Sequence, residues 1–328
     1  MQRAIRSNWF VILLSLGVVG VIIHELIGPS SRQPLISSAP PADSAWVAPS
    51  LDLDQQLTGK GREMVLYGED LIRNTAAYFG PNGSVKKISN GMNCQNCHLD
   101  AGTRQWGNNF SAVNATYPKF RARSNSVETV TKRINDCFER SLNGTHPDSN
   151  SNEMQAMRAY FNWLGKDVPK GKQPYSSGLP TLPFMDRAAD TAKGRIVYTS
   201  SCQSCHGQDG AGIPNPDGKG YIYPPLWGPH SYNDGAGLFR ISKFSSFVKS
   251  NMPFNQATHA NAVLSDEQAW DVAGFVNSQT RPHKDQSGDW KDISKKSFDE
   301  PFGPYADGYN EQQHKYGPFQ EIKNKTSK

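Results

Sequence analysis

The sequence predicts a mainly α-helical protein of two similar small domains with long loops, followed by a C-terminal extension that wraps over them. Two observations lead to this prediction. Only 36% of the 328 residues are hydrophobic, and the chain holds 29 Gly and 22 Pro, which is too few core-forming side chains for one large core. A Cys-x-x-Cys-His segment also occurs twice, at residues 94–98 and 202–206, each time between two segments of helical pattern. This repeated order indicates a duplicated unit.

Each unit is expected to have one helix before its motif and one after it. Residues 59–74 precede the first motif, and residues 185–200 precede the second. Residues 151–164 and 265–278 follow the motifs. Each of these later segments begins with a serine, has an acidic residue in its first turn, and then shows apolar residues three or four positions apart. That is the pattern of an N-capped amphipathic helix, so the two helices of each unit are expected to cross beside the motif.

The motif itself indicates covalently bound haem. At this spacing two thiols bond to one haem while the adjacent histidine ligates its iron. The expected attachment residues are Cys94, Cys97, Cys202 and Cys205, with His98 and His206 as iron ligands. A redox dithiol or half of a zinc site is the alternative for a single Cys-x-x-Cys, but zinc would need a second pair in each half. Each unit therefore resembles a class I cytochrome c whose interior is filled largely by the porphyrin, and two haem c groups are expected.

The N-terminal segment has the plan of an export signal. Arg3 and Arg6 precede an apolar run over residues 9–23, which is shorter than the ~20 residues of a membrane-spanning helix. No clear cleavage site follows. An uncleaved N-terminal anchor, the one membrane contact expected, therefore stays open beside a removed signal. In both cases the folded part is expected in the periplasm.

These features define an expected domain order. The limits are residues 1–28 for the signal or anchor, 29–50 for a Pro/Ser-rich linker, 51–170 for the first haem domain, 171–283 for the second and 284–328 for the extension. The extension is expected to be an ordered wrap because it is rich in aromatic residues, which disordered segments lack. The net charge of +5 comes from scattered basic residues without a basic stripe, so nucleic acid is not an expected partner.

Each iron needs a second axial ligand from the loop before its last helix. In the second domain Met252 precedes Pro253 just ahead of that helix, and a thioether there would give the His/Met ligation of electron-transfer cytochromes. His230 and His259 are the alternatives, and a plain core methionine is the other interpretation.

The first domain offers no methionine in the corresponding loop. Residues 99–149 contain Cys137 and His146 instead. Cys137 is the odd cysteine of five, since the other four belong to the motifs. A buried small hydrophobe is one interpretation of Cys137. The other is an iron-bound thiolate stabilised by the neighbouring cations Lys132, Arg133 and Arg140. Composition alone leaves the two interpretations even.

At these residues the chain resembles the thiosulfate dehydrogenases, dihaem c-type cytochromes with His/Cys ligation of the first haem. The resemblance runs from about residue 51 to about residue 323 and is carried by NCQNCHLDAG, RINDCFERSLNG, EMQAM, PPLWGPHSY, NMPFNQ and HKYGPF. It implies that Cys137 is the distal ligand and active-site sulfur of the first haem and that Met252 is the distal ligand of the second. It also implies that the substrate pocket is lined by Arg123, Arg133, Ser141 and Gln155.

The implied reaction joins two thiosulfate dianions into tetrathionate and releases two electrons. Arginine suits this task because its guanidinium pairs with sulfonate oxygens and is permanently charged, although any one arginine could instead pair with a haem propionate. The electrons would go to a soluble cytochrome c or a high-potential iron–sulfur protein. The reverse reaction, tetrathionate reduction, is equally open from sequence.

Two other functions remain as alternatives. One is a non-catalytic dihaem electron carrier in which His146 ligates the first iron and Cys137 only packs. The other is the haem-thiolate cytochrome of a multienzyme thiosulfate-oxidising complex. A Met-ligated second haem in the same chain favours self-contained oxidation over the second of these alternatives.

Overall fold

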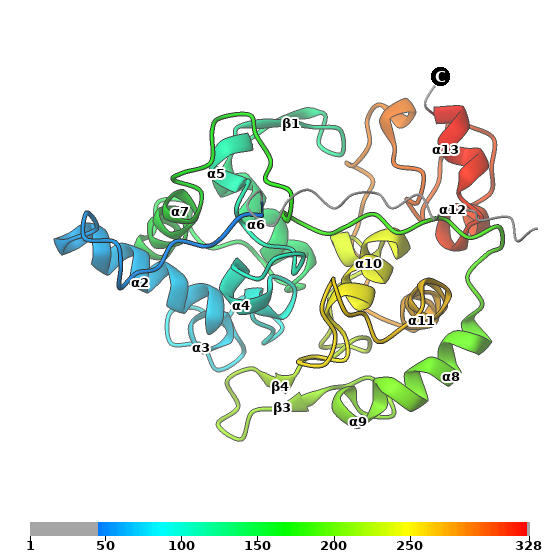
Figure 1. Cartoon of the computed structure of the whole chain (residues 1–328), viewed down its shortest axis with the longest axis horizontal. Helices are drawn as coiled ribbons and strands as arrows, with labels where there is room; N and C mark the ends of the chain where they lie inside the picture. The colour runs from blue at the N-terminus through cyan, green and yellow to red at the C-terminus, as the bar shows by residue number, and fades with distance from the viewer. Residues whose placement is uncertain (1–44, 327–328) are drawn as a thin grey trace, which may run out of the picture. The chain divides into compact units, whose positions relative to one another are not determined.

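The computed structural model describes residues 45–326 as helices joined by long loops, with two short antiparallel hairpins (Figure 1). The first half contains α2 (Gly59–Arg73), α3 (Thr75–Phe79), η2 (Cys94–Asn96), α4 (Leu99–Gly102), α5 (Val113–Thr116), β1 (Lys119–Arg121), β2 (Ser126–Glu128), α6 (Val130–Arg140) and α7 (Asn152–Leu164). The second half contains α8 (Thr191–Ser201), α9 (Gln203–His206), β3 (Ile213–Pro214), β4 (Tyr221–Tyr223), η3 (Gly237–Phe239), α10 (Ile241–Asn251) and α11 (Asp266–Ser278). The extension contains η4 (Ile293–Lys295), α12 (Glu311–Tyr316) and α13 (Gln320–Thr326).

The predicted signal or anchor lies outside the described residues, as does most of the linker. Within residues 45–326 no helix is both long and apolar enough to cross a membrane.

The two halves repeat the same helix crossing, as the duplicated pattern predicts. In the first half α2 packs on α7, and in the second half α8 packs on α11. A glycine lies at each contact. A Cβ on Gly68 would lie 2.1 Å from the backbone oxygen of Ala156, and a Cβ on Gly194 would lie 2.0 Å from that of Asp271. Only glycine therefore allows the backbones to approach this closely.

The helices that follow the motifs begin where the sequence predicts. The Ser151 hydroxyl accepts the backbone N–H of Met154 at 3.2 Å at the start of α7. Ser265 caps α11 in the same way, and the side chain of Gln268 accepts the backbone N–H of Ser265 at 2.8 Å, which completes a capping box. Both caps satisfy N–H groups that have no partner inside the helix.

The start of α8 differs from the prediction. The helix begins at Thr191 rather than near Met185, because the Asp190 carboxylate accepts the backbone N–H groups of Ala192 and Lys193 and so caps the helix there. The residues before Asp190 are held by the ion pair between Arg187 and Asp271 at 2.7 Å. A local capping residue therefore sets the boundary more strongly than the apolar spacing does.

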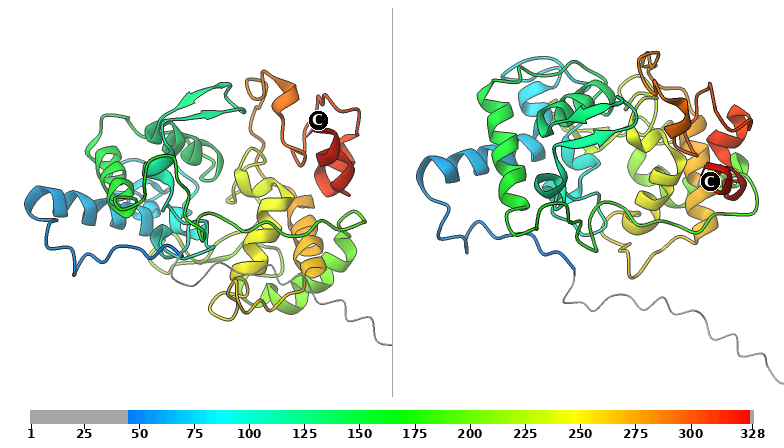
Figure 2. Two further views of the ribbon diagram at one scale, coloured as in Figure 1. Left: turned by 45° about the horizontal axis from the view of Figure 1, so that its top comes forward. Right: turned by 90° about the horizontal axis from the view of Figure 1, so that it is seen from above.

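Each half has its own hydrophobic core. The first gathers around Tyr160 and Phe138, and the second around Trp270 and Tyr198, all of which are buried. The C-terminal extension adds to the second core, because Phe319 and Ile322 are buried in it. Figure 2 shows the C-terminal helices (red) next to the yellow and orange helices of the second half, so the end of the extension packs on that half.

Polar contacts join the two halves near the helix that carries Cys137. The side-chain amide of Asn233 donates to the backbone oxygen of Glu139 at 2.8 Å. The backbone N–H of Asn233 donates to the backbone oxygen of Arg140 at 3.1 Å. Farther away, the Asn251 amide donates to the backbone oxygen of Trp106 at 3.0 Å. The end of α6 is thus fixed partly by residues of the second half.

Candidate functional site

The first motif opens into a large, mostly apolar cavity, called here the first haem cavity. It is lined by Cys94, Cys97, His98 and Cys137 and by the apolar side chains of Ile72, Met92, Phe110, Ile134, Phe138 and Phe161, among others. Its empty volume, counted together with the space that opens to solvent, is about 1220 Å³. The apolar lining beside the two motif cysteines and the histidine fits a porphyrin.

His98 is prepared to bind a metal through one ring nitrogen. Its Nδ1 lies 2.6 Å from the backbone oxygen of Asn108 and donates to it, so Nε2 is the nitrogen left to act as a ligand. Burial lowers the pKa of His98 to about 4, which keeps the ring neutral. Phe110 stacks on the imidazole with ring centres 4.3 Å apart and fixes its orientation.

The second motif repeats this arrangement in the second haem cavity. Cys202, Cys205, His206 and Met252 all line a cavity with an empty volume of about 1510 Å³. The Nδ1 of His206 donates to the backbone oxygen of Pro224 at 2.8 Å, and burial lowers the pKa of this histidine as well. Met252 reaches the cavity because it directly follows α10 as its C-cap residue.

The alternative ligands lie outside the two haem cavities. His230 and His259 are exposed and do not line the second haem cavity. The ring of His259 instead packs against that of Trp106, with the ring centres 4.6 Å apart. His146 is also exposed, lies outside the first haem cavity, and its Nδ1 contacts the backbone oxygen of Pro147 at 3.1 Å. The cavities thus bring Met252 and Cys137, and not these histidines, to the motif residues.

The zinc alternative finds no support in the described part of the chain. Nowhere in residues 45–326 do three or more His, Cys, Asp or Glu side chains converge as a metal-binding group. The motif cysteines form no disulfide and line a large apolar space. The residues present therefore fit a covalently attached haem in each half.

A single face of α6 carries the chemistry of the first half. Arg133, Cys137 and Ser141 follow one another at intervals of four residues, so they lie on the same side of the helix, and all three line the first haem cavity. The helix is fixed at its start by Thr129, whose hydroxyl accepts the N–H of Lys132 at 3.2 Å. Cys137 is the main electrostatic influence that raises the pKa of Arg133. The guanidinium therefore lies close to the Cys137 sulfur.

Cys137 also faces a second, polar space, called here the cationic cavity. Arg133, Cys137 and Ser141 line it together with Arg121 and Arg123 from the β1–β2 hairpin. The remaining charged or polar lining comes from the second half and the extension and includes Arg240, Lys243, Trp290, Lys295 and Glu300. An anion in this cavity would therefore lie beside the Cys137 sulfur and among several cations.

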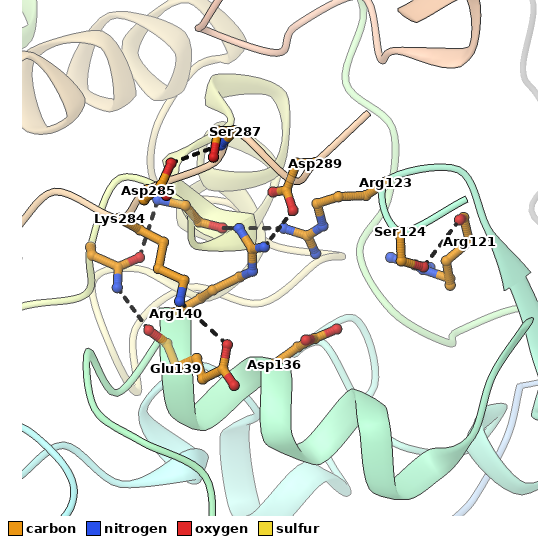
Figure 3. Close-up of polar contacts among 12 residues, drawn as sticks. Arg121, Arg123, Ser124, Asp136, Glu139, Arg140, Lys284, Asp285, Ser287 and Asp289 are labelled. Atoms are coloured by element: carbon orange, nitrogen blue, oxygen red, sulfur yellow. Dashed lines mark hydrogen bonds and ion pairs between the residues drawn. The ribbon is translucent and has the colours of Figure 1, made fainter. Parts of the chain in front are cut away.

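Arg123 has an unusually positive environment. Burial, together with the charges of Arg140 and Arg133, lowers its pKa to about 10. Its Nη1 donates to the backbone oxygen of Gly235 at 3.2 Å. Figure 3 shows Arg123 beside Arg140 and Asp289, with Arg140 reaching from α6 to that carboxylate. Such crowded cations favour the binding of an anion.

Gln155 does not reach either cavity. Its side chain is exposed, and its amide donates to the backbone oxygen of Asn150 at 3.0 Å. It lies in the first turn of α7, where it supports the loop before the helix. Of the four predicted pocket residues, the structure thus brings Arg123, Arg133 and Ser141 together and leaves Gln155 outside.

The two haem cavities share a wall. Asn93 lines both of them. The second haem cavity is also lined by Gln95 and Asn96 of the first motif and by Leu99 and Asp100, which directly follow it. Groups bound in the two cavities are therefore separated only by the first motif and its neighbours.

Comparisons with known proteins agree with this arrangement. Residues 84–169 match the SoxA/TsdA cytochrome c domain, and residues 191–280 match the cytochrome c family. The chain is 33% identical over 278 residues to the thiosulfate dehydrogenase of Stutzerimonas stutzeri, which covers 84% of this chain and 87% of that protein. It is 41% identical over 199 residues to the thiosulfate dehydrogenase of Allochromatium vinosum, or 60% of this chain and 72% of that one.

A solved structure shows the same relation in three dimensions. The "as isolated" form of the thiosulfate dehydrogenase (TsdBA) from Marichromatium purpuratum superposes with a TM-score of 0.67 at 32% identity. The match covers 74% of this chain and 51% of the solved one, so this chain spans about half of that protein. Two cytochrome c domains, each with its motif, account for two covalently bound haem c groups.

Proposed function

The chain belongs to the thiosulfate dehydrogenase family, and we propose that it is a dihaem enzyme that oxidises two thiosulfate ions to tetrathionate and passes the electrons to an external acceptor. One observation carries the proposal: the Cys137 thiol lines both the first haem cavity and the cationic cavity. The two cavities are continuous, because Cys97 and His98 also line both. A Cys137 sulfur bound to the iron would therefore also meet an anion held by the arginines.

The axial ligands in this proposal are His98 and Cys137 in the first haem cavity and His206 and Met252 in the second. Support comes from the two backbone hydrogen bonds that leave Nε2 of each histidine available, and from the position of Cys137 and Met252 in the same cavities. When bound, the haems would supply one-electron redox chemistry.

Arg133 and Arg123 orient the substrate. Thiosulfate carries two negative charges, and a guanidinium offers paired donors to its sulfonate oxygens. Neither arginine has an ion-pair partner among the described residues, so both charges are free for an anion. The Ser141 hydroxyl can donate to the same group. Because these donors are held in place before the substrate arrives, they also offset the repulsion between the two thiosulfate dianions that must approach each other.

The chemistry at Cys137 has two steps. In the first, a bond forms between the Cys137 sulfur and the outer sulfur of thiosulfate, which gives a cysteine S-thiosulfonate and releases two electrons. In the second, the outer sulfur of another thiosulfate attacks the central sulfur of that adduct. The bond to Cys137 breaks, tetrathionate leaves, and the thiolate is restored. No proton or further oxidant is needed, and the charges balance.

Three further features belong to the same proposal. His206 and Met252 would hold the haem from which electrons would leave for a soluble cytochrome c or a high-potential iron–sulfur protein. The reaction can also run backwards as tetrathionate reduction, because the same two steps are reversible. Export to the periplasm is proposed from the N-terminal sequence and from the need to attach haem outside the cytoplasm.

The test is an assay on the purified holoprotein. Thiosulfate with ferricyanide should give one tetrathionate for every two ferricyanide ions reduced, and tetrathionate with a reduced viologen should give thiosulfate. Ferricyanide reduction without tetrathionate would instead support the electron-carrier alternative.

A further inference from the structure

The cationic cavity contains more positive charge than the first half supplies. Six cationic side chains line it against two acidic ones. Two of the six are neutralised by carboxylates: Arg240 pairs with Asp299, and Lys295 pairs with Asp292 at 3.1 Å. Among residues 45–326 the other four form no ion pair; they are Arg121, Arg123, Arg133 and Lys243. Three belong to the first half, and Lys243 alone is contributed by α10.

Lys243 lies in the first turn of α10, three residues after Arg240. Its side chain is exposed, lines the cavity and forms no ion pair within residues 45–326. Its ammonium group is therefore available to an anion that enters the cavity. The opposite end of the same helix leads to Met252, so α10 connects the cationic cavity with the second haem cavity.

Trp290 gives a second, independent observation. It lines the same cavity, and its indole Nε1 is buried without any hydrogen-bond partner. An indole N–H can only donate, so this atom lacks an acceptor. Its backbone is also held in the left-handed region at φ 55°, which is uncommon for a residue other than glycine and requires support from its surroundings. That support includes a backbone hydrogen bond: the main-chain N–H of Trp290 donates to the backbone oxygen of Arg123 at 2.7 Å.

A reaction that joins two dianions needs a place for each. Arg133 lies next to Cys137 on α6 and serves the thiosulfate that bonds to the sulfur. We propose that Lys243 and Trp290 form a second sulfonate subsite, which holds the attacking thiosulfate and later one end of tetrathionate. The inference rests on the proposed function. It goes beyond that function because it gives α10 and the C-terminal extension a direct role in binding the substrate.

The subsite has a simple chemical logic. The Lys243 ammonium offers three donors and one positive charge, and the Trp290 N–H offers a single directed donor. A sulfonate has three oxygens and one negative charge, so it can satisfy both. Its arrival also provides the acceptor that Trp290 lacks and the counter-charge that Lys243 lacks.

The experiment measures binding without turnover. The probe is 1,2-ethanedisulfonate, which keeps two sulfonate ends but has methylene groups in place of the central sulfurs and therefore cannot react with Cys137. Its Kd for the oxidised holoprotein is measured by titration calorimetry. Lys243→Met should raise the Kd by about tenfold, and Trp290→Phe by about fivefold, because each removes one donor to the anion. Lys243→Arg should restore most of the affinity.

Lys291→Met is the matched control. Lys291 is exposed, directly follows Trp290 and does not line the cavity, so this variant should bind the probe like the wild type. The visible spectrum and the midpoint potential of each haem should be unchanged in all variants. Trp290→Phe keeps the ring and its packing, so it tests the N–H even if Lys243→Met folds poorly.

Two outcomes would overturn the inference. One is wild-type affinity in both Lys243→Met and Trp290→Phe. The other is an unchanged Kd accompanied by a shifted haem potential in Lys243→Met, which would assign the lysine to a haem propionate. Failure of the proposed function is a separate result, because it would appear as a wild-type holoprotein that makes no tetrathionate from thiosulfate.

Discussion

The helix that carries Cys137 is held by a buried ion pair whose removal can be quantified. Arg140, at the end of α6, donates to Asp289 of the extension at 2.8 Å, and the two side chains are only 10% and 12% exposed. Arg140 also donates to the backbone oxygen of Gly235 at 3.3 Å. Figure 3 shows this contact next to Arg123. The change Asp289→Asn keeps the shape of the side chain and removes its charge.

We expect a large loss of stability from this single change. Removing one partner of a buried pair leaves an uncompensated charge and costs about 3–5 kcal/mol. For a chain of this size, about 3 kcal/mol corresponds to a decrease in Tm of about 6–12 °C. The decrease is measured by thermal unfolding of the holoprotein, followed by circular dichroism at 222 nm. Turnover at temperatures near the new Tm should fall as well, because α6 places Cys137.

The adjacent residue provides the control. Glu139 pairs with Lys284 of the extension at 3.3 Å, and both side chains are 30% exposed. Glu139→Gln should therefore lower the free energy of unfolding by less than about 1 kcal/mol, because ion pairs accessible to solvent contribute little to stability. Equal effects of Asp289→Asn and Glu139→Gln would refute the argument that burial makes the Arg140 pair important.

Three further predictions follow from the fold and the site. Gly68→Ala should lower the free energy of unfolding by about 1–3 kcal/mol, measured by chemical denaturation, because the added methyl group overpacks against α7. Gly61→Ala on the same helix is the control. Its Cβ would meet nothing closer than 3.8 Å, so this change should be neutral or stabilising. Met252→Ala should lower the midpoint potential of the second haem in a redox titration, because methionine ligation raises it. Hydrogen bonding to Asp234 raises the pKa of His283. The pair should therefore stabilise the fold at low pH, and this stabilisation should be lost as the pH rises through the raised pKa. Asp234→Asn should return the pKa of His283, measured by NMR, to its ordinary value.

The sequence was sufficient to predict the fold because its signals are local. The Cys-x-x-Cys-His spacing, the serine caps at Ser151 and Ser265, and the paired helical segments each act within a few residues. The absence of methionine from residues 99–149 also directed attention to Cys137, which the structure places in the first haem cavity. These features need no knowledge of long-range contacts.

The rest of the cationic cavity depends on tertiary structure. Lys243 and Trp290 lie more than a hundred residues after Cys137, and nothing in their local sequence marks them as neighbours of it. Arg121 was missed as well. It is the last residue of β1, whereas Arg123 lies in the following turn, so only the folded hairpin shows that both line the cavity. Gln155 was expected in the pocket from its motif, but the start of α7 directs its amide to the preceding loop.

The central claim is that the Cys137 sulfur is both the ligand of the first iron and the reacting group. The most direct measurement is the thiosulfate-to-tetrathionate assay on the Cys137→Ser holoprotein, with haem content and the ferric EPR spectrum recorded on the same sample. The account predicts two attached haems, because the four motif cysteines are untouched, together with a changed low-spin signal from the first haem and no tetrathionate formation. A Cys137→Ser protein with two haems, an unchanged EPR spectrum and near-wild-type production of tetrathionate would contradict it.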